Sequence, residues 1–329
     1  MNWFHASTAA LNASAKAHRR WSVPTNAWID VFDVAAKQGI FLAFRPLDRL
    51  GAVVISEPGA GSGIIVNSKH PLSRQRYSVA HELGHIFFKH PSIVDMADIF
   101  ESGAAAKTDE EKLAESFASW FLMPPDLLDD YVSRRGIERI STAEQVYQLS
   151  LFLGTSYEST ANHLRYTKRA SQQRAQSWLQ VHPQEIKHRL AGKFEPDSWR
   201  SDIHALEEVD DGTSRLGRSG DRFIVQLHEI PSSGYRWQMG RTDAFGVLSD
   251  DYDSEYSPEV GVTPTGTLRK RRFVLSAKEV EQRTDASIVF EQVRMWRRHE
   301  PARRFEVRVT VESTERVGFP ARYLNEIAA

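Results

Sequence analysis

The chain of 329 residues contains no cysteine. Disulfide bonds, thiolate metal ligands and a cysteine nucleophile are therefore excluded, and we expect a reducing compartment. A net charge of one sign is also lacking, because 42 basic residues oppose 43 acidic ones, so the charge favours neither nucleic acid nor a membrane surface. Apolar runs fall short of the roughly 18 residues that span a bilayer, and residues 1–20 lack the apolar core of a signal peptide. These absences predict a cytoplasmic protein with no membrane partner.

Apolar residues repeat with different periods along the chain, which predicts an α+β architecture with several domains. Residues 1–25 are weakly patterned, and a helix is predicted over 27–38. Alternating apolar residues dominate from about residue 221, and they predict an all-β, immunoglobulin-like sandwich. Between these parts, a small antiparallel sheet is predicted from three β-rich runs at 40–44, 52–55 and 63–67.

The strongest chemical signal lies in a helical pattern over 73–89. His81 and His85 are four residues apart, so both imidazoles share one helix face and can reach one Zn²⁺ at about 2.0–2.1 Å. Glu82 can accept a proton from the water that attacks a peptide carbonyl. Two surface histidines would be the plainer explanation, but their apolar neighbours indicate a largely buried helix, where histidines need partners. The pattern therefore predicts a zinc peptidase.

Zinc also needs a third protein ligand and an open fourth position. The next helical pattern, over 109–122, offers Glu110, Glu111 and Glu115. One carboxylate could bind the metal while another orients a metal-bound histidine. An acidic first turn that complements the helix dipole would also explain these residues, and charge spacing alone does not choose among them.

The sequence around this motif resembles the ImmA/IrrE family of metallopeptidases over about residues 25–170. The resemblance rests on RQRYSVAHELGH at 74–85, EKLA at 111–114 and FASWFLMP at 117–124. It implies a zincin-like peptidase domain in which Glu111 is the third zinc ligand. Glu115 stands where the family usually has Asn, and we expect this carboxylate to orient a ligand. Members typically cleave a transcriptional repressor, which implies a separate helix-turn-helix repressor as the partner and a role in stress or mobile-element regulation.

The run at 143–164 has the spacing of a helix-turn-helix. Gly154 would lie in the turn, with Leu149, Leu153 and Leu164 packed inward. Direct DNA binding through 148–165 is one interpretation. A packed helical extension of the peptidase is the other, and the balanced charge favours it, so DNA is not the expected partner.

Three loops of the predicted sandwich combine turn residues with a large aromatic ring or a guanidinium, which suits a binding surface on a rigid scaffold. In this order they resemble the loops of chagasin-like inhibitors of papain-type cysteine peptidases, over about 205–315. Ile230 and Met295 depart from the Asn and Pro of that family, and the second loop, at 260–267, is less rich in glycine. Trp237 is expected in the core instead. The candidate binding residues are Pro231, Ser232, Ser233, Gly234, Tyr235, Arg294 and Trp296.

Together these observations predict a peptidase domain at 1–135, a helical extension at 136–194, a linker at 195–218, a chagasin-like β domain at 219–316 and a tail at 317–329. The predicted activity is zinc-dependent hydrolysis of a peptide bond in a specific protein, with a β domain that recognises a partner or regulates the peptidase. Two alternatives stay open: binding or inhibition of a papain-type peptidase through the loops, and direct DNA binding. The sequence leaves the substrate, the activating signal and the oligomeric state open.

Overall fold

A computed structural model describes residues 1–48, 50–57, 61–90, 108–252, 266–294, 296 and 300–313. The chain forms two compact units. The first comprises residues 1–132 and 153–175, and the second comprises residues 133–152 and 176–314. The chain therefore passes from one unit to the other three times in or beside the range 136–194.

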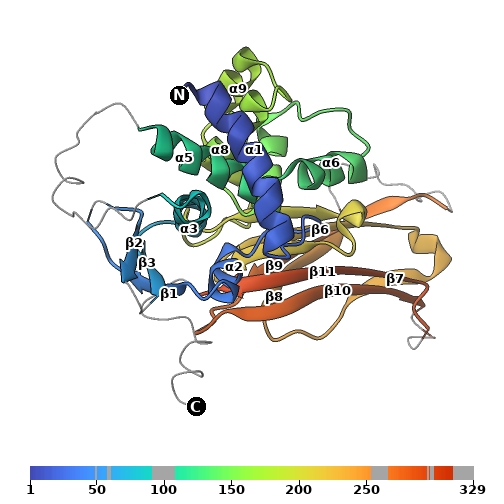
Figure 1. Cartoon of the computed structure of the whole chain (residues 1–329). Coiled ribbons are helices and arrows are strands. Elements are labelled where there is room, and N and C mark those ends of the chain that lie inside the picture. Colours follow the sequence, from blue (N-terminus) through green and yellow to red (C-terminus); the bar gives the residue numbers. More distant parts are fainter. Residues whose placement is uncertain are drawn as a thin grey trace. The chain divides into compact units, whose positions relative to one another are not determined.

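The first unit is organised around helix α5 (Asp109–Leu122), which packs against α1 (Trp3–Arg20) and α3 (Leu72–Phe88) (Figure 1). The apolar pattern did not predict α1, because its buried face is built mainly from alanine, which gives little hydrophobic contrast. Asn2 caps this helix by accepting a hydrogen bond from the His5 amide at 2.9 Å. The buried alanines of α1 are Ala6, Ala10, Ala13 and Ala17.

Helix α5 begins and ends where the sequence predicts. Thr108 caps its first turn by accepting from the Glu111 amide at 3.2 Å. Its last carbonyls are left without helical partners, and two buried histidines bind there: His18 Nε2 lies 2.9 Å from the Phe121 oxygen, and His163 Nε2 lies 3.1 Å from the Met123 oxygen. Burial lowers the pKa of both imidazoles, in His163 to about 4.

The small sheet is mixed, so the prediction of an antiparallel sheet was wrong for one strand pair. Strand β3 (Gly61–Asn67) lies between β1 (Phe41–Arg45) and β2 (Ala52–Glu57), parallel to β1 and antiparallel to β2. The hairpin β2–β3 turns the chain back, and β3 then runs alongside β1 in the same direction. Strand β3 takes the central position, and its Ile64 and Val66 are buried in the core. The preceding helix α2 (Val31–Lys37) begins later than the predicted residue 27, at the Asp30 cap.

The second unit contains a β sandwich of two four-stranded sheets, in the orders β5-β11-β10-β7 and β4-β6-β9-β8. Alternate residues of both sheets point inward and form one apolar core that includes Trp237, Phe273 and Phe290. This confirms the predicted sandwich. Its strands are β4 (Ile203–Glu207), β5 (Ser214–Arg218), β6 (Arg222–Glu229), β7 (Tyr235–Met239), β8 (Phe245–Tyr252), β9 (Arg269–Ala277), β10 (Thr284–Arg294) and β11 (Arg303–Glu312).

Strands β4 and β5 lie in the range 195–218, for which the polar sequence predicts a linker. Within the part of the chain that the structure describes, each strand is paired on one side only, β4 with β6 and β5 with β11, both in parallel. The composition of this range is polar, but Ile203 and Leu206 are buried and join β4 to the sandwich. The edge position explains why the hydrophobic signal is short.

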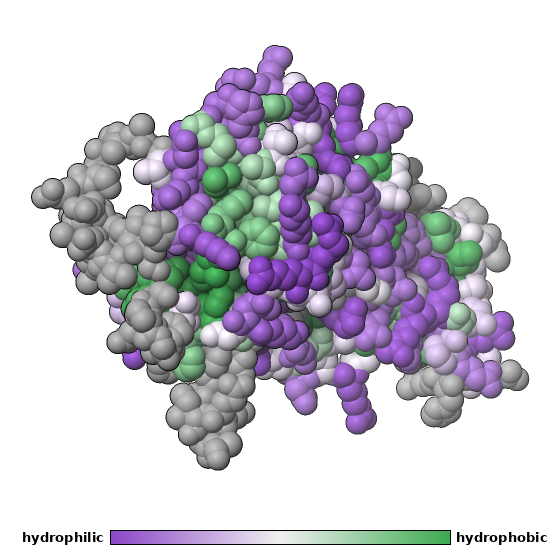
Figure 2. Space-filling view, in the orientation of Figure 1, coloured by the Kyte–Doolittle hydropathy of each residue, from purple (hydrophilic) through white to green (hydrophobic). Residues whose placement is uncertain are grey.

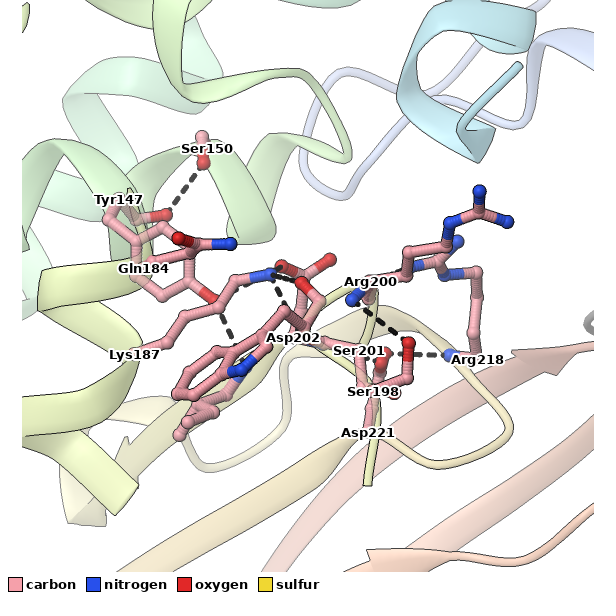
Figure 3. Close-up of polar contacts among 12 residues, drawn as sticks. Tyr147, Ser150, Gln184, Lys187, Ser198, Arg200, Ser201, Asp202, Arg218 and Asp221 are labelled. Carbon is pink, nitrogen blue, oxygen red and sulfur yellow. Dashed lines mark hydrogen bonds and ion pairs between the residues drawn. The ribbon is translucent and has the colours of Figure 1, made fainter. Parts of the chain in front are cut away.

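Helical side chains cover the free edge of β4. The second unit contains α7 (Ala143–Leu153) and α10 (Pro183–Ala191), and α9 (Gln172–Leu179) crosses into it. The Tyr147 hydroxyl of α7 accepts from the Ile203 amide at 3.0 Å and donates to Asp202 at 3.1 Å. Lys187 of α10 pairs with the same carboxylate at 2.8 Å, and Figure 3 shows how these side chains converge. The edge is therefore closed by hydrogen bonds rather than left open for pairing with another strand.

The helix-turn-helix spacing is present in the fold. Helix α8 (Tyr157–Tyr166) follows α7, and Gly154 between them has φ 66°, a conformation that favours glycine. The predicted inward residues Leu149, Leu153 and Leu164 are all buried. Helix α6 (Pro125–Arg134) precedes this segment. Among the described residues, no helix combines the length and the apolar character needed to cross a membrane.

The buried His163 predicts a pH-dependent stability of the first unit. In the folded protein its pKa of about 4 lies below the ordinary value of 6.5, so between these values the imidazole is neutral in the folded state and protonated in the unfolded chain. The free energy of unfolding is therefore not reduced by His163 above about pH 6.5. As the pH falls toward 4, protonation of the unfolded chain lowers it by about 1 kcal/mol per pH unit. His163→Gln keeps an amide donor for the Met123 carbonyl but cannot titrate. We expect the free energy of unfolding of wild type to fall more steeply than that of the variant over this window, in denaturant titrations at matched pH; parallel slopes would contradict the assignment.

Candidate metal centre

The predicted histidines lie on successive turns of helix α3, on the same face. His81 and His85 point the same way, and their Nε2 atoms are 3.1 Å apart. Their side chains are 20% and 17% exposed, so the nitrogen pair is sheltered but can be reached from outside. The helix is largely buried on its other side, through Val79, Ala80 and Leu83.

Glu111 reaches the same point from the first turn of α5. Its two carboxylate oxygens lie 3.4 Å from His81 Nε2 and 3.4 Å from His85 Nε2. These three residues form a group that could hold a metal ion. Charge spacing left three glutamates open, and the family resemblance implied Glu111; this is the residue that the structure places against both histidines.

A glycine makes this approach possible. A Cβ at Gly84 would lie 3.1 Å from the Ala114 Cα and 3.1 Å from Phe117 Cδ1, both in α5. Such distances are shorter than ordinary carbon contacts, so any larger residue would push the helices apart. The element that approaches Gly84 is therefore the helix α5.

The donor atoms have a spacing that suits zinc. Nitrogen and oxygen ligands at about 2.0–2.1 Å in a tetrahedron are separated by about 3.3–3.4 Å. The three separations here are 3.1, 3.4 and 3.4 Å. Two imidazoles and one carboxylate, with a fourth position free for a water or a substrate, are also a usual donor set for a catalytic zinc. The residues present therefore fit the metal that the sequence predicts.

The charges of this group are strongly coupled. Hydrogen bonds from His81 and His85 hold the pKa of Glu111 far below its usual value. Burial acts to lower the pKa of His81, but the Glu111 hydrogen bond and the charges of Glu82, Glu111 and Glu115 outweigh it, and the pKa is raised. Burial raises the pKa of Glu82, against the smaller effect of the two histidines. A carboxylate with a raised pKa is a stronger base, as the role predicted for Glu82 requires.

Glu115 lies one turn after Glu111, and its charge contributes to the raised pKa of His81. Its backbone carbonyl accepts hydrogen bonds from Tyr77 Oη at 3.1 Å and from Ser119 Oγ at 3.2 Å. The predicted orienting role of its carboxylate stays a prediction.

A further histidine, His90, lies beside this group, and the sequence motif does not predict it. Its Nδ1 lies 3.0 Å from the Nδ1 of His85, on the side of that ring opposite to the predicted metal position. It stands five residues after His85, just beyond the end of α3, so helical spacing does not point to it. The sequence feature that could have indicated His90 is the presence of a third histidine a few residues after the metal motif.

The predicted binding loops of the sandwich also meet. Pro231–Ser233 form a 3₁₀ turn, and Gly234 follows with φ 78°. A Cβ at Gly234 would lie 2.5 Å from the Trp296 ring, so the first and third loops are in contact there. The Arg294 guanidinium lies 4.6 Å from the centre of the Tyr235 ring. Trp296 is 68% exposed, whereas Trp237 is buried in the core as predicted.

The second loop falls largely outside the described residues, since 253–265 is not described. At its end, the Gly266 amide donates to Ser232 Oγ at 2.9 Å. Ser233 Oγ donates to the Ile230 carbonyl at 2.6 Å and so holds the first turn. The predicted loop residues that are described therefore gather at one end of the sandwich.

Gln148 is engaged within the fold. Its amide nitrogen donates to the Ile203 carbonyl and its oxygen accepts from the Ala205 amide, each at 2.9 Å. A side chain that uses both amide groups on β4 has little left to read a base edge. This supports the packed interpretation of the segment over direct DNA binding.

Two family models match the chain. The IrrE N-terminal-like domain, Peptidase_M78, matches residues 35–165, and the chagasin family peptidase inhibitor I42 matches residues 218–311. A comparison with curated proteins finds no match.

Solved structures give weaker similarity. The cysteine protease inhibitor EhICP2 from Entamoeba histolytica is 24% identical, with a TM-score of 0.29, over 34% of this chain and 97% of its own. PbICP-C, solved in complex with falcipain-2, is 12% identical, with a TM-score of 0.23, over 34% of this chain and 92% of its own. A Mycobacterium tuberculosis transcriptional regulator is 14% identical, with a TM-score of 0.31, over 84% of this chain and 82% of its own.

Every one of these TM-scores is below 0.5, so the family models, and not the solved structures, identify the parts of the chain. Both matches fall where the sequence resemblances predicted them. The chain joins a domain of the IrrE N-terminal-like Peptidase_M78 family to a C-terminal domain of the chagasin family of peptidase inhibitors.

Proposed function

We propose that this chain is a zinc-dependent endopeptidase that hydrolyses a peptide bond in a specific protein. The observation that carries the proposal is the meeting of His81, His85 and Glu111 with Glu82 beside them, within the range that matches a peptidase family. Zinc would be held by the two Nε2 atoms and the Glu111 carboxylate, and when bound it would supply a Lewis acid for the scissile carbonyl.

In this proposal Glu82 moves the proton. Its carboxylate accepts a proton from the attacking water and passes it to the amine that leaves when the peptide bond breaks. The raised pKa of Glu82 suits both steps, because the same group must bind and release a proton near neutral pH. A cation at the histidines would act in the opposite direction on this pKa.

We further propose that the substrate is a separate cytoplasmic transcriptional repressor of the helix-turn-helix class. The support is the sequence resemblance to repressor-cleaving peptidases. Hydrophobic side chains gather over α3, α5 and the small sheet on the face shown in Figure 2, as a protein substrate would require, whereas most of that face is hydrophilic. Cleavage would then switch on stress or mobile-element genes.

A second function is favoured by the contact between the loops of the sandwich. Gly234 under Trp296 and Ser232 bonded to Gly266 hold together the loops that correspond in order to those of chagasin-like inhibitors. We propose that this end of the β domain binds a protein partner, with a papain-type cysteine peptidase as the first candidate. In the same chain, such binding could direct or restrain the zinc peptidase.

Replacing Glu82 tests the peptidase. Glu82→Gln keeps the side-chain shape and leaves the three metal ligands in place, so bound zinc should be unchanged. Loss of the base should lower cleavage by about 10²–10⁴-fold. We would quantify zinc in both purified proteins and compare protein N-termini in the native host that carries either form. A new N-terminus that appears only with wild type names the substrate; equal zinc and identical N-termini under every stress tried would oppose the proposal.

Replacing Gly84 tests the dependence of the metal site on helix packing. Gly84→Ala should raise helix propensity by about 1 kcal/mol, yet its methyl group would push α5 and Glu111 away from the histidines. We expect zinc affinity to fall by about tenfold or more, measured by chelator competition. Gly63→Ala is the matched control, because a Cβ there meets nothing closer than 3.5 Å. Equal affinity in the two variants would show that the close contact does not position Glu111.

Titration of papain tests the loops, with the full chain carrying Glu82→Gln so that its own peptidase is silent. We expect inhibition that weakens by about tenfold or more in Trp296→Ala, because this exposed ring would be buried by the partner. Trp199→Ala removes a tryptophan outside the three loops and should leave inhibition unchanged. Unaltered papain activity at micromolar protein would exclude this partner.

A further inference from the structure

The end of helix α3 is shaped in a way that the peptidase motif alone does not explain. The helix stops at Phe88, and Lys89 takes the left-handed conformation with φ 58° and ψ 39°. The His90 amide then donates to the His85 carbonyl at 3.0 Å. This reverses the chain and turns His90 back over the last turn of the helix, although Lys89 is not the glycine usually found at such a position.

The reversal places two imidazoles against each other. His90 Nδ1 and His85 Nδ1 are 3.0 Å apart, and the ring planes meet at 73°. Phe88 stacks on His90 with ring centres 5.4 Å apart, and Phe88 itself contacts Phe117 of α5. The His90 ring is thus braced by the same aromatic packing that holds α3 and α5 together.

Only one arrangement of protons is compatible with a metal at His85. The Nε2 of His85 faces His81 and Glu111, so it must carry no proton when it acts as a ligand. The ring proton of His85 then sits on Nδ1, where it is donated to His90 Nδ1. If His90 donated instead, the proton of His85 would lie on Nε2 and would occupy the metal position. The nearby Glu111 carboxylate would favour that second arrangement, so an acceptor at Nδ1 is needed to oppose it.

We propose that His90 is a positioning residue whose Nδ1 accepts the His85 Nδ1 proton and thereby keeps His85 Nε2 free and correctly turned for zinc. This inference rests on the proposed metal function. His90 touches neither the substrate nor the metal in this role; it acts through His85. A carboxylate or a backbone carbonyl is the commoner partner of a metal-bound histidine, and here the helix C-terminus supplies a second histidine in its place.

The test compares two replacements of similar size in the full chain. His90→Leu removes the acceptor and can still pack on Phe88. His90→Asn keeps an acceptor, because its Oδ1 stands at the same number of bonds from the backbone as the imidazole Nδ1. We expect the zinc dissociation constant, from chelator competition, to rise about 10–100-fold in His90→Leu and to stay within a few-fold of wild type in His90→Asn. Thermal unfolding of the metal-free proteins checks that both fold.

A second readout follows the proton itself. In the zinc-loaded wild type, the His85 Nδ1 proton should give a slowly exchanging NMR signal, which persists in His90→Asn and is lost in His90→Leu. If His90→Leu keeps wild-type zinc affinity and an unchanged NMR signal, the inference is wrong and the peptidase proposal still stands. The same holds if both variants lose zinc affinity and the signal equally. Failure of wild type to bind zinc would instead remove the proposed function on which the inference rests.

Discussion

The close contact between α3 and α5 is the constraint on which the candidate metal centre depends. Gly84 lets the backbone of Ala114 come to a distance that no side chain would permit. Glu111 precedes Ala114 by one helical turn, so the same contact brings its carboxylate to 3.4 Å from both histidines. The rings of Phe87 and Phe117 stack beside this point, and Trp21 closes over both. Apolar packing therefore holds three polar donors at the spacing of metal ligands, which is how a rigid site is usually built.

The sandwich uses a related device at its loops. The Trp296 ring packs so closely on Gly234 that any Cβ there would collide with it. The positive φ of Gly234 would also be costly for another residue. Below the loops, the buried Glu229 carboxylate pairs with Arg236 at 2.8 Å and accepts from the Trp237 amide at 3.0 Å. These bonds link the strands on both sides of the first loop. The loop that carries the exposed Trp296 is thus held in place by these contacts. An ordered loop loses less conformational entropy than a flexible loop when it binds a partner.

The helical segment that resembles a DNA reader is used for packing. Tyr147 and Gln148 close the edge of β4, and Arg76 of α3 is fully buried, with its guanidinium donating to the Gly154 carbonyl at 2.8 Å. Carbonyls at a helix C-terminus attract a cation, so the turn after α7 supplies a partner for this charge. A helix-turn-helix spacing therefore indicates how two helices are connected and not whether they bind DNA. The function of each polar side chain depends on its surroundings in the fold.

The sequence by itself determined the elements whose signals are local. The spacing of His81 and His85, the bounds of α5 between Thr108 and Pro124, and the alternation in the sandwich all depend on residues within a few positions of each other. Charge spacing did not choose among the three glutamates, and only the family resemblance pointed to Glu111. Which glutamate meets the histidines depends on how α5 is rotated and how closely Gly84 lets it approach, and both are features of the tertiary structure. The tertiary structure also decided the parallel pairing of β1, the alanine-faced helix α1, the strands within 195–218 and the return of His90 to His85. Each of these features depends on a contact between residues that no local sequence pattern connects, so the neighbouring residues do not predict it.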